Sequence, residues 1–130
     1  MALAAMAMLA SGSLRADETP LAEEMDVVSS ALKGLRKADG WEAKAELARE
    51  AQQGCLNGLK YLPKTFEQMK DAKEKAKATA DYERLMGDAY SALCQLESAF
   101  LEEDQDAADE AMDLIKSLKK EGHTKYEDDE

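Results

Sequence analysis

The sequence has few of the features that enzymes and nucleic-acid-binding proteins need. Its 130 residues include a single histidine and only 17 basic residues against 28 acidic ones, a formal net charge of −11. It has no glycine-rich phosphate loop and no Glu-x-x-His pair of the di-iron helical bundles. No face is basic enough to bind a phosphate backbone. The sequence therefore argues against an enzyme and a nucleic-acid partner, and favours a partner with basic or neutral faces.

Aromatic and β-branched residues are also scarce. Aromatic residues make up 5% of the chain, and the low content of valine and isoleucine disfavours β-strands. The hydrophobic residues, 45% of the chain, are mainly alanine, leucine and methionine, which favour helices. A chain of this length forms one domain that is large enough to bury a core. We therefore predict an all-α protein with a single domain, residues 17–130.

Long apolar runs are absent. The run from residue 2 to residue 10 is far shorter than the roughly 20 residues needed to cross a membrane. Small residues follow it, and Ala16 lies where a signal peptidase would cut. Two features depart from an export signal, since no basic residue precedes the run and Leu14 stands three places before the cut. We interpret residues 1–16 as a signal peptide, with an ordinary apolar tail as the alternative.

Four segments have apolar residues at alternating steps of three and four, the periodicity of amphipathic helices. Their expected bounds are about 20–37, 41–62, 82–103 and 105–121. Thr19 and Pro20 form a typical helix start, because proline has no amide hydrogen to leave unpaired there. We expect Pro63 to stop the second helix and Gly122 to stop the fourth.

The connections between these segments predict how the helices are arranged. Residues 64–80 have no apolar periodicity and carry five lysines among acidic residues, which is typical of a solvated, partly helical connection. The other two connections, residues 38–40 and 102–105, are short. Four helices joined in this way predict an antiparallel up-down-up-down four-helix bundle.

Such a bundle brings the start of its first helix and the end of its fourth to the same end of the molecule. Met25 stands near that start and His123 near that end. Taken singly, Met25 is an ordinary core residue and His123 an ordinary solvated or helix-capping residue. Taken together, a thioether facing an imidazole is an axial ligand pair for haem iron. This ligation leaves no open site for substrate, so it favours one-electron transfer over oxygen activation.

The aromatic residues gather at this same end of the expected bundle. They are Tyr61, Phe66, Tyr82 and Tyr126. With Met86, one turn beyond Tyr82, they would line a flat apolar cofactor; the alternative is that they pack in the core and against loops. Lys119, one turn before His123, is a candidate partner for a haem propionate, or else an ordinary surface lysine.

The chain lacks the Cys-x-x-Cys-His motif that attaches haem covalently, so a haem would be b-type and held non-covalently. Its two cysteines, Cys55 and Cys94, would be open to oxidation in an exported protein. In the expected register they are offset along the helices by about 10 Å, more than the roughly 7 Å that a disulfide tolerates. We therefore expect two buried thiols.

Two stretches of the sequence share the pattern of a known family. They are LAEEMDVVSSALKGLRKAD, residues 21–39, and the closing stretch from Asp81-Tyr82 through HTKY at residues 123–126. Both align without gaps with the soluble cytochromes b562, and the family's ligand methionine and histidine fall on Met25 and His123. The second helix matches in length and in its terminal proline. The sequence thus resembles this family over nearly all of the chain after residue 16, at low identity.

The resemblance implies a monomeric, periplasmic electron carrier with one non-covalent haem b. Tyr82 and Met86 would take the places of family aromatic residues that pack on the haem. Two positions depart from the family pattern: Gly122 directly precedes the ligand histidine, and Lys119 stands where members often carry arginine, a better fork for a propionate. A haem-free periplasmic bundle that binds other proteins is the alternative, and a carboxylate-rich metal binder is a third hypothesis.

Overall fold

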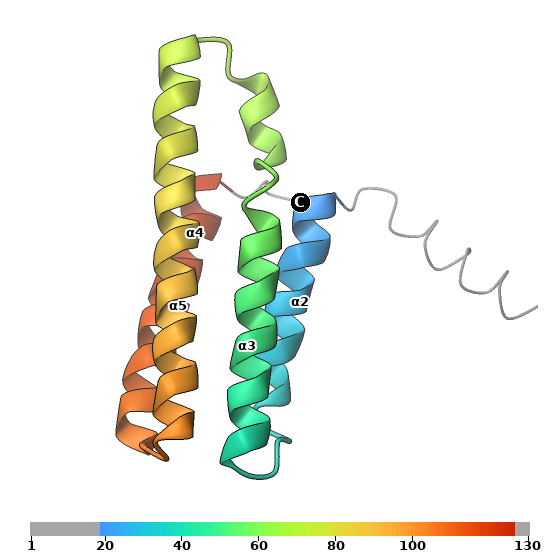
Figure 1. Cartoon of the computed structure of the whole chain (residues 1–130). Coiled ribbons are helices and arrows are strands. Elements are labelled where there is room, and N and C mark those ends of the chain that lie inside the picture. The colour runs from blue at the N-terminus through green and yellow to red at the C-terminus, as the bar shows by residue number, and fades with distance from the viewer. Residues whose placement is uncertain (1–18, 127–130) are drawn as a thin grey trace, which may run out of the picture.

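Four α-helices and one short 3₁₀ helix make up the part of the chain, residues 19–126, that the computed structural model describes (Figure 1). They are α2 (Pro20–Gly34), α3 (Trp41–Gly58), the 3₁₀ helix η1 (Lys64–Gln68), α4 (Ala72–Leu101) and α5 (Gln105–Tyr126). No strand occurs within residues 19–126, so the prediction of an all-α protein is confirmed. The signal peptide assigned to residues 1–16 lies outside the described residues.

Polar side chains cap three of the α-helices at their N-termini. Thr19 accepts a hydrogen bond from the amide of Ala22 at 3.1 Å, as the Thr-Pro pair predicts. Asp71 caps α4 in the same way through the amide of Lys73, and Asp104 caps α5. These caps satisfy amide groups that have no partner within the helix, so they define where each helix begins.

The helix α4 differs most from its predicted bounds. It begins at Ala72 instead of near residue 82 and is 30 residues long. Residues 72–77 are all exposed and therefore show no apolar periodicity, but their alanines, lysines and glutamate have high helix propensity and follow the Asp71 cap. The predicted connection at 64–80 is thus largely helical. Figure 1 shows α4 extending beyond the other helices at the end where η1 lies.

Three helix ends also differ from the prediction, and one of them is that of α2, which ends at Gly34 instead of near residue 37. The helix α5 continues through Gly122 to Tyr126, because contacts of Tyr126 with other elements outweigh the ~1 kcal/mol that a helical glycine costs. The helix α3 ends earlier than predicted, at Gly58. The apolar residues that follow, Leu59 and Leu62, are 36% and 42% exposed and have no place in the core.

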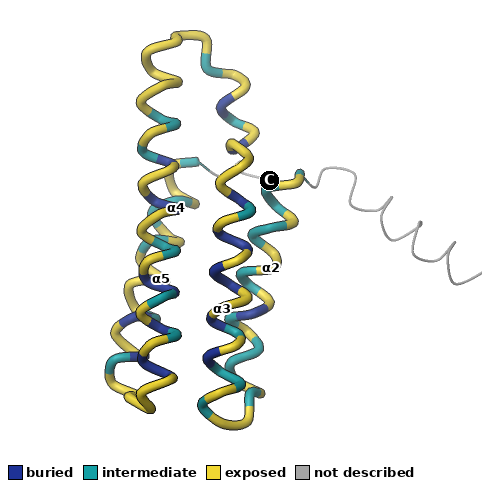
Figure 2. The backbone as a smooth tube through the Cα atoms, in the orientation of Figure 1, coloured by how far each residue is buried: buried dark blue, intermediate teal, exposed yellow. Residues whose placement is uncertain are grey.

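The core consists mainly of alanine and leucine, on the sides of the helices that face one another (Figure 2). The largest fully buried side chains are Phe66, Leu93 and Leu96. On α3 the buried positions include Ala45, Ala48 and Ala51, so its neighbours can approach closely. Because many of the buried side chains are small, the core depends on close packing of the helices.

The helices pack most closely with their neighbours in the sequence, α2 with α3, α3 with α4 and α4 with α5. No comparably close packing joins the first of these helices to the last. We call this side of the bundle the α2–α5 edge. In the part of the chain that is described, no helix combines the length and the hydropathy that a membrane span requires.

Candidate functional site

Gly58, the last residue of α3, is the point where three of the predicted site residues meet. A Cβ atom added to Gly58 would lie 3.0 Å from Cε of Met25 and 2.9 Å from Cε of Met86. Both thioether side chains therefore pack against the bare backbone of Gly58, one from α2 and one from α4. The hydroxyl of Tyr82 donates a hydrogen bond of 3.5 Å to the carbonyl oxygen of the same glycine.

The surroundings of Gly58 are apolar and favour neutral groups. Tyr82 and Met86 are buried, and Met25 is half-buried. Burial raises the pKa of Tyr82 to about 12, with a smaller effect from Cys55. Burial likewise raises the pKa of Cys55 to about 11. The phenol and the thiol are therefore both neutral at physiological pH.

Three aromatic rings form a cluster beside this point. The ring of Phe66, in η1, lies edge-to-face with the rings of Tyr82 and Tyr126 at centroid distances of 6.1 and 5.2 Å, and the two tyrosine rings are 6.2 Å apart. Phe66 is 1% exposed, whereas Tyr61 is 38% exposed. The prediction that aromatic residues gather at one end is thus confirmed for these three rings, which we call the aromatic cluster.

A polar network borders the aromatic cluster. Asp81 accepts hydrogen bonds from the hydroxyl of Tyr126, from Arg84 at 3.0 Å and from Lys125 at 3.3 Å. The bonds from Tyr126 and Arg84 lower the pKa of the Asp81 carboxyl to about 2. Glu121 pairs with Arg84 at 3.1 Å and with Lys125 at 2.9 Å. The network joins the first half of α4 to the last turns of α5.

His123 lies within this last part of α5, and its side chain is exposed. A chain of contacts shows that His123 is at the same end of the bundle as Met25. Tyr126, three residues after His123, contacts Tyr82. Tyr82 in turn bonds to Gly58, against which Met25 packs. Lys119, one turn before His123, is exposed as well. Met25 thus packs against the core, whereas the histidine and the lysine lie on the surface.

A thioether and an imidazole are chemically suited to hold haem iron. Met25 and His123 belong to the two helices that border the α2–α5 edge, the side of the bundle that packs least closely. Met86 and Tyr82 supply an apolar lining at the same end. Within residues 19–126, no group of three or more His, Cys, Asp or Glu residues is arranged to hold a metal ion. A pair made of one methionine and one histidine is a different kind of ligand set, to which this finding does not apply.

The two cysteines are free thiols. Cys55 is buried in α3, as expected, while Cys94 in α4 is only half-buried, which corrects the expectation of two buried thiols. The sequence analysis did not identify Gly58 or Asp81 as site residues. The sequence did hold a signal for Gly58: it follows Gly54 by one helical turn, and a glycine inside a helix often marks close packing. Nothing in the sequence linked Asp81 to Tyr126.

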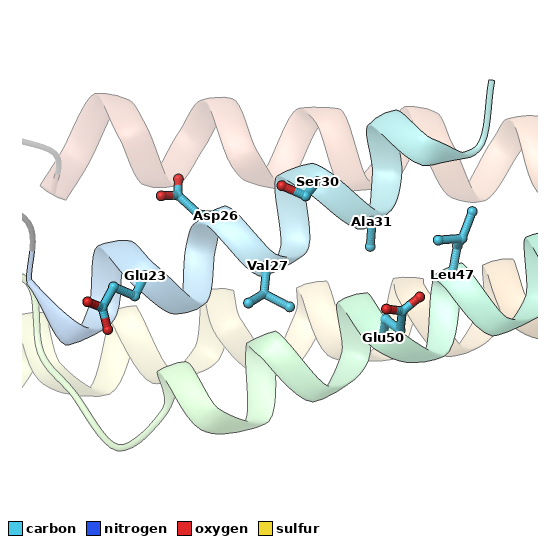
Figure 3. Close-up of a pocket in the computed structure, with 7 residues that line it drawn as sticks. All are labelled: Glu23, Asp26, Val27, Ser30, Ala31, Leu47 and Glu50. Carbon is cyan, nitrogen blue, oxygen red and sulfur yellow. The ribbon is translucent and has the colours of Figure 1, made fainter. Parts of the chain in front are cut away.

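A shallow groove lies on another face, between α2 and α3 (Figure 3). Its lining residues are Glu23, Asp26, Val27, Ser30, Ala31, Leu47 and Glu50. Three of these are carboxylates around an apolar floor, and Val27 is 43% exposed. The groove borders the helix that carries Met25, and its acidic rim is consistent with the net charge of the chain.

Comparisons with protein-family models, with curated proteins and with solved structures find no match to this chain. The described residues, by their helices alone, define a four-helix bundle without strands.

Proposed function

We propose that this protein is an electron carrier of the cytochrome b562 type, with one non-covalent haem b held by Met25 and His123. The observation that carries the proposal is the meeting of Met25, Tyr82 and Met86 at Gly58, at the end of the bundle where α5 presents His123. The resemblance of residues 21–39 and 81–126 to that family supports it.

The proposal includes an antiparallel up-down-up-down arrangement of the helices. In support, early residues of one helix contact late residues of the next. Gly34 of α2 packs near Leu47 of α3, whereas Gly58 of α3 packs near Leu21 of α2. The ring of Trp41, at the start of α3, lies 6.3 Å from that of Phe100, near the end of α4.

Each candidate residue has a distinct role in this proposal. Met25 offers a soft thioether from the apolar interior, and His123 offers an imidazole nitrogen from α5. Tyr82 and Met86 exclude water, and Lys119 pairs with a propionate. When bound, the haem supplies a one-electron iron couple. Because Met25 and His123 would both hold the iron, no site for substrate would remain there, and the haem would serve electron transfer.

The proposed setting is the bacterial periplasm, where the protein acts as a monomer and exchanges electrons with partner proteins. The net charge of −11 favours partners with basic or neutral faces. Attraction of this kind speeds encounter and weakens as salt screens it.

A haemin titration of the purified protein, followed by reduction with dithionite, tests the proposed function. We expect sharp low-spin absorption bands that saturate at one equivalent of haem. Broad absorbance of free haemin alone would contradict the proposal.

The acidic groove between α2 and α3 favours the second candidate function, a haem-free bundle that binds other proteins. In that case the protein is colourless when isolated, already fully folded, and unchanged by added haemin.

A further inference from the structure

We propose that Tyr126 is a positioning residue, which fixes the last turn of α5, and with it His123, against α4 and η1. The ligand role of His123 rests on the proposed function, but the anchoring of the turn does not.

Tyr126 is held through three different parts of the residue. Its hydroxyl donates a hydrogen bond to the carboxylate of Asp81 in α4. Its carbonyl oxygen accepts a hydrogen bond of 3.2 Å from the hydroxyl of Thr65 in η1. Its ring packs edge-to-face on Phe66 of η1 and Tyr82 of α4. The end of α5 is therefore fastened to two other elements through one residue.

The last turn of α5 needs such an anchor. The carbonyl group of Tyr126 accepts a hydrogen bond from the side chain of Thr65, which lies outside α5. Gly122 lies in the same turn and lowers its helical stability. A turn of this kind frays unless tertiary contacts hold it. Since His123 lies between Gly122 and Tyr126, fraying would move its imidazole.

Two basic side chains fix the carboxylate of Asp81 in position to accept the hydrogen bond from Tyr126. Arg84 and Lys125 both contact its carboxylate, and Arg84 also pairs with Glu121 of α5. A hydrogen bond to an ionised carboxylate is stronger than one between neutral groups. Removing the tyrosine hydroxyl therefore breaks one polar link between α4 and α5 at this point, while the ring remains.

Two variants with matched controls test the inference in the full-length protein. Tyr126→Phe removes the hydroxyl and keeps the ring, and Asp81→Ala removes the acceptor. Asp81→Asn retains an acceptor oxygen but loses the charge, so its effect should lie between those of Asp81→Ala and no substitution. Tyr90→Phe, which removes a hydroxyl elsewhere on α4, is the control.

The first measurement is amide hydrogen exchange in the protein without haem. We expect residues 122–126 to exchange about tenfold faster in Tyr126→Phe and Asp81→Ala, with exchange in α3 unchanged. The second measurement is the absorption spectrum with haem, in which both variants should gain high-spin bands. Both variants should also release haem faster, as followed by the decay of that spectrum. Tyr90→Phe should match the unmodified protein in both measurements.

The outcomes separate the inference from the proposed function. Unchanged exchange in Tyr126→Phe overturns the anchor. Faster exchange with an unchanged haem spectrum overturns the positioning role. If the unmodified protein binds no haem, the proposed function fails, and the exchange rate of the His123 amide then decides whether Tyr126 holds this turn.

Discussion

The backbones of α2 and α3 touch at Glu24 and Gly54: a Cβ atom built on Gly54 would lie 3.0 Å from the carbonyl oxygen of Glu24. It would also lie 2.8 Å from a methyl carbon of Val28. Because backbone and a branched side chain cannot move aside easily, we expect Gly54→Ala to destabilise the fold by about 1–3 kcal/mol. Urea unfolding followed by circular dichroism measures this.

Gly87 and Gly122 provide the matched control for that substitution. Each lies within a helix and has nothing within 4 Å of an added Cβ atom. Alanine at either position should therefore stabilise the protein by roughly 0.5–1 kcal/mol, through higher helix propensity and a less flexible unfolded chain. If Gly54→Ala were stabilising as well, the close contact between α2 and α3 would be wrong.

Replacement of Met25 tests the proposed ligand pair directly. We expect Met25→Ala to convert low-spin haem to a high-spin, five-coordinate form, while His123→Ala should lose most of the haem affinity. Met112→Ala, which shortens another half-buried methionine that packs against the core, should keep the low-spin spectrum. Unchanged spectra in both ligand variants would refute the assignment.

Gly58→Ala should change haem binding much more than it changes the free energy of unfolding. The added methyl group comes too close only to the flexible ends of Met25 and Met86, and it lies at an ordinary contact distance of 3.5 Å from Leu21. The free energy of unfolding should therefore change by less than about 1 kcal/mol. The Met25 thioether must nevertheless move. We therefore expect weaker haem binding, or a partly high-spin spectrum, in a variant that unfolds almost as the original does.

Acid should weaken the link between α4 and α5 over a defined pH range. The native pKa of Asp81, about 2, lies below its ordinary value of 3.8, so the native state binds fewer protons than the unfolded state between these values. The stability that Asp81 contributes is therefore complete above about pH 4 and is lost as the pH falls toward 2. Asp81→Asn should reduce this pH dependence of the free energy of unfolding.

The two thiols should react at different rates with a thiol-specific reagent. Cys55 is 2% exposed, and burial raises its pKa to about 11, so it offers little thiolate. Cys94 is half-buried and should react first. At pH 8 we expect one fast equivalent, which is absent in Cys94→Ser, and a second only on unfolding. A fast reaction in Cys94→Ser would contradict the buried position of Cys55.

Sequence patterns were sufficient for the helical class and for most of the core. Alternating steps of three and four residues place one side of a helix in the interior, as the buried residues of α3 show. The same rule failed at residues 72–77, because a solvated helix needs no apolar side and shows no such period. The prediction that Gly122 ends the fourth helix was wrong, because the low helix propensity of glycine is a local property and does not reveal the contacts of Tyr126 that outweigh it.

The sequence by itself determined the local preferences of this protein: its helices, its caps at Thr19 and Asp104, and the positions of one methionine and one histidine near opposite ends of the chain. Only the tertiary structure decided that Met25 meets Met86 over Gly58 and that Tyr126 reaches Asp81. The reason is physical. Propensity and periodicity act within a few residues, whereas these contacts join residues that are far apart in the chain and depend on how whole helices pack.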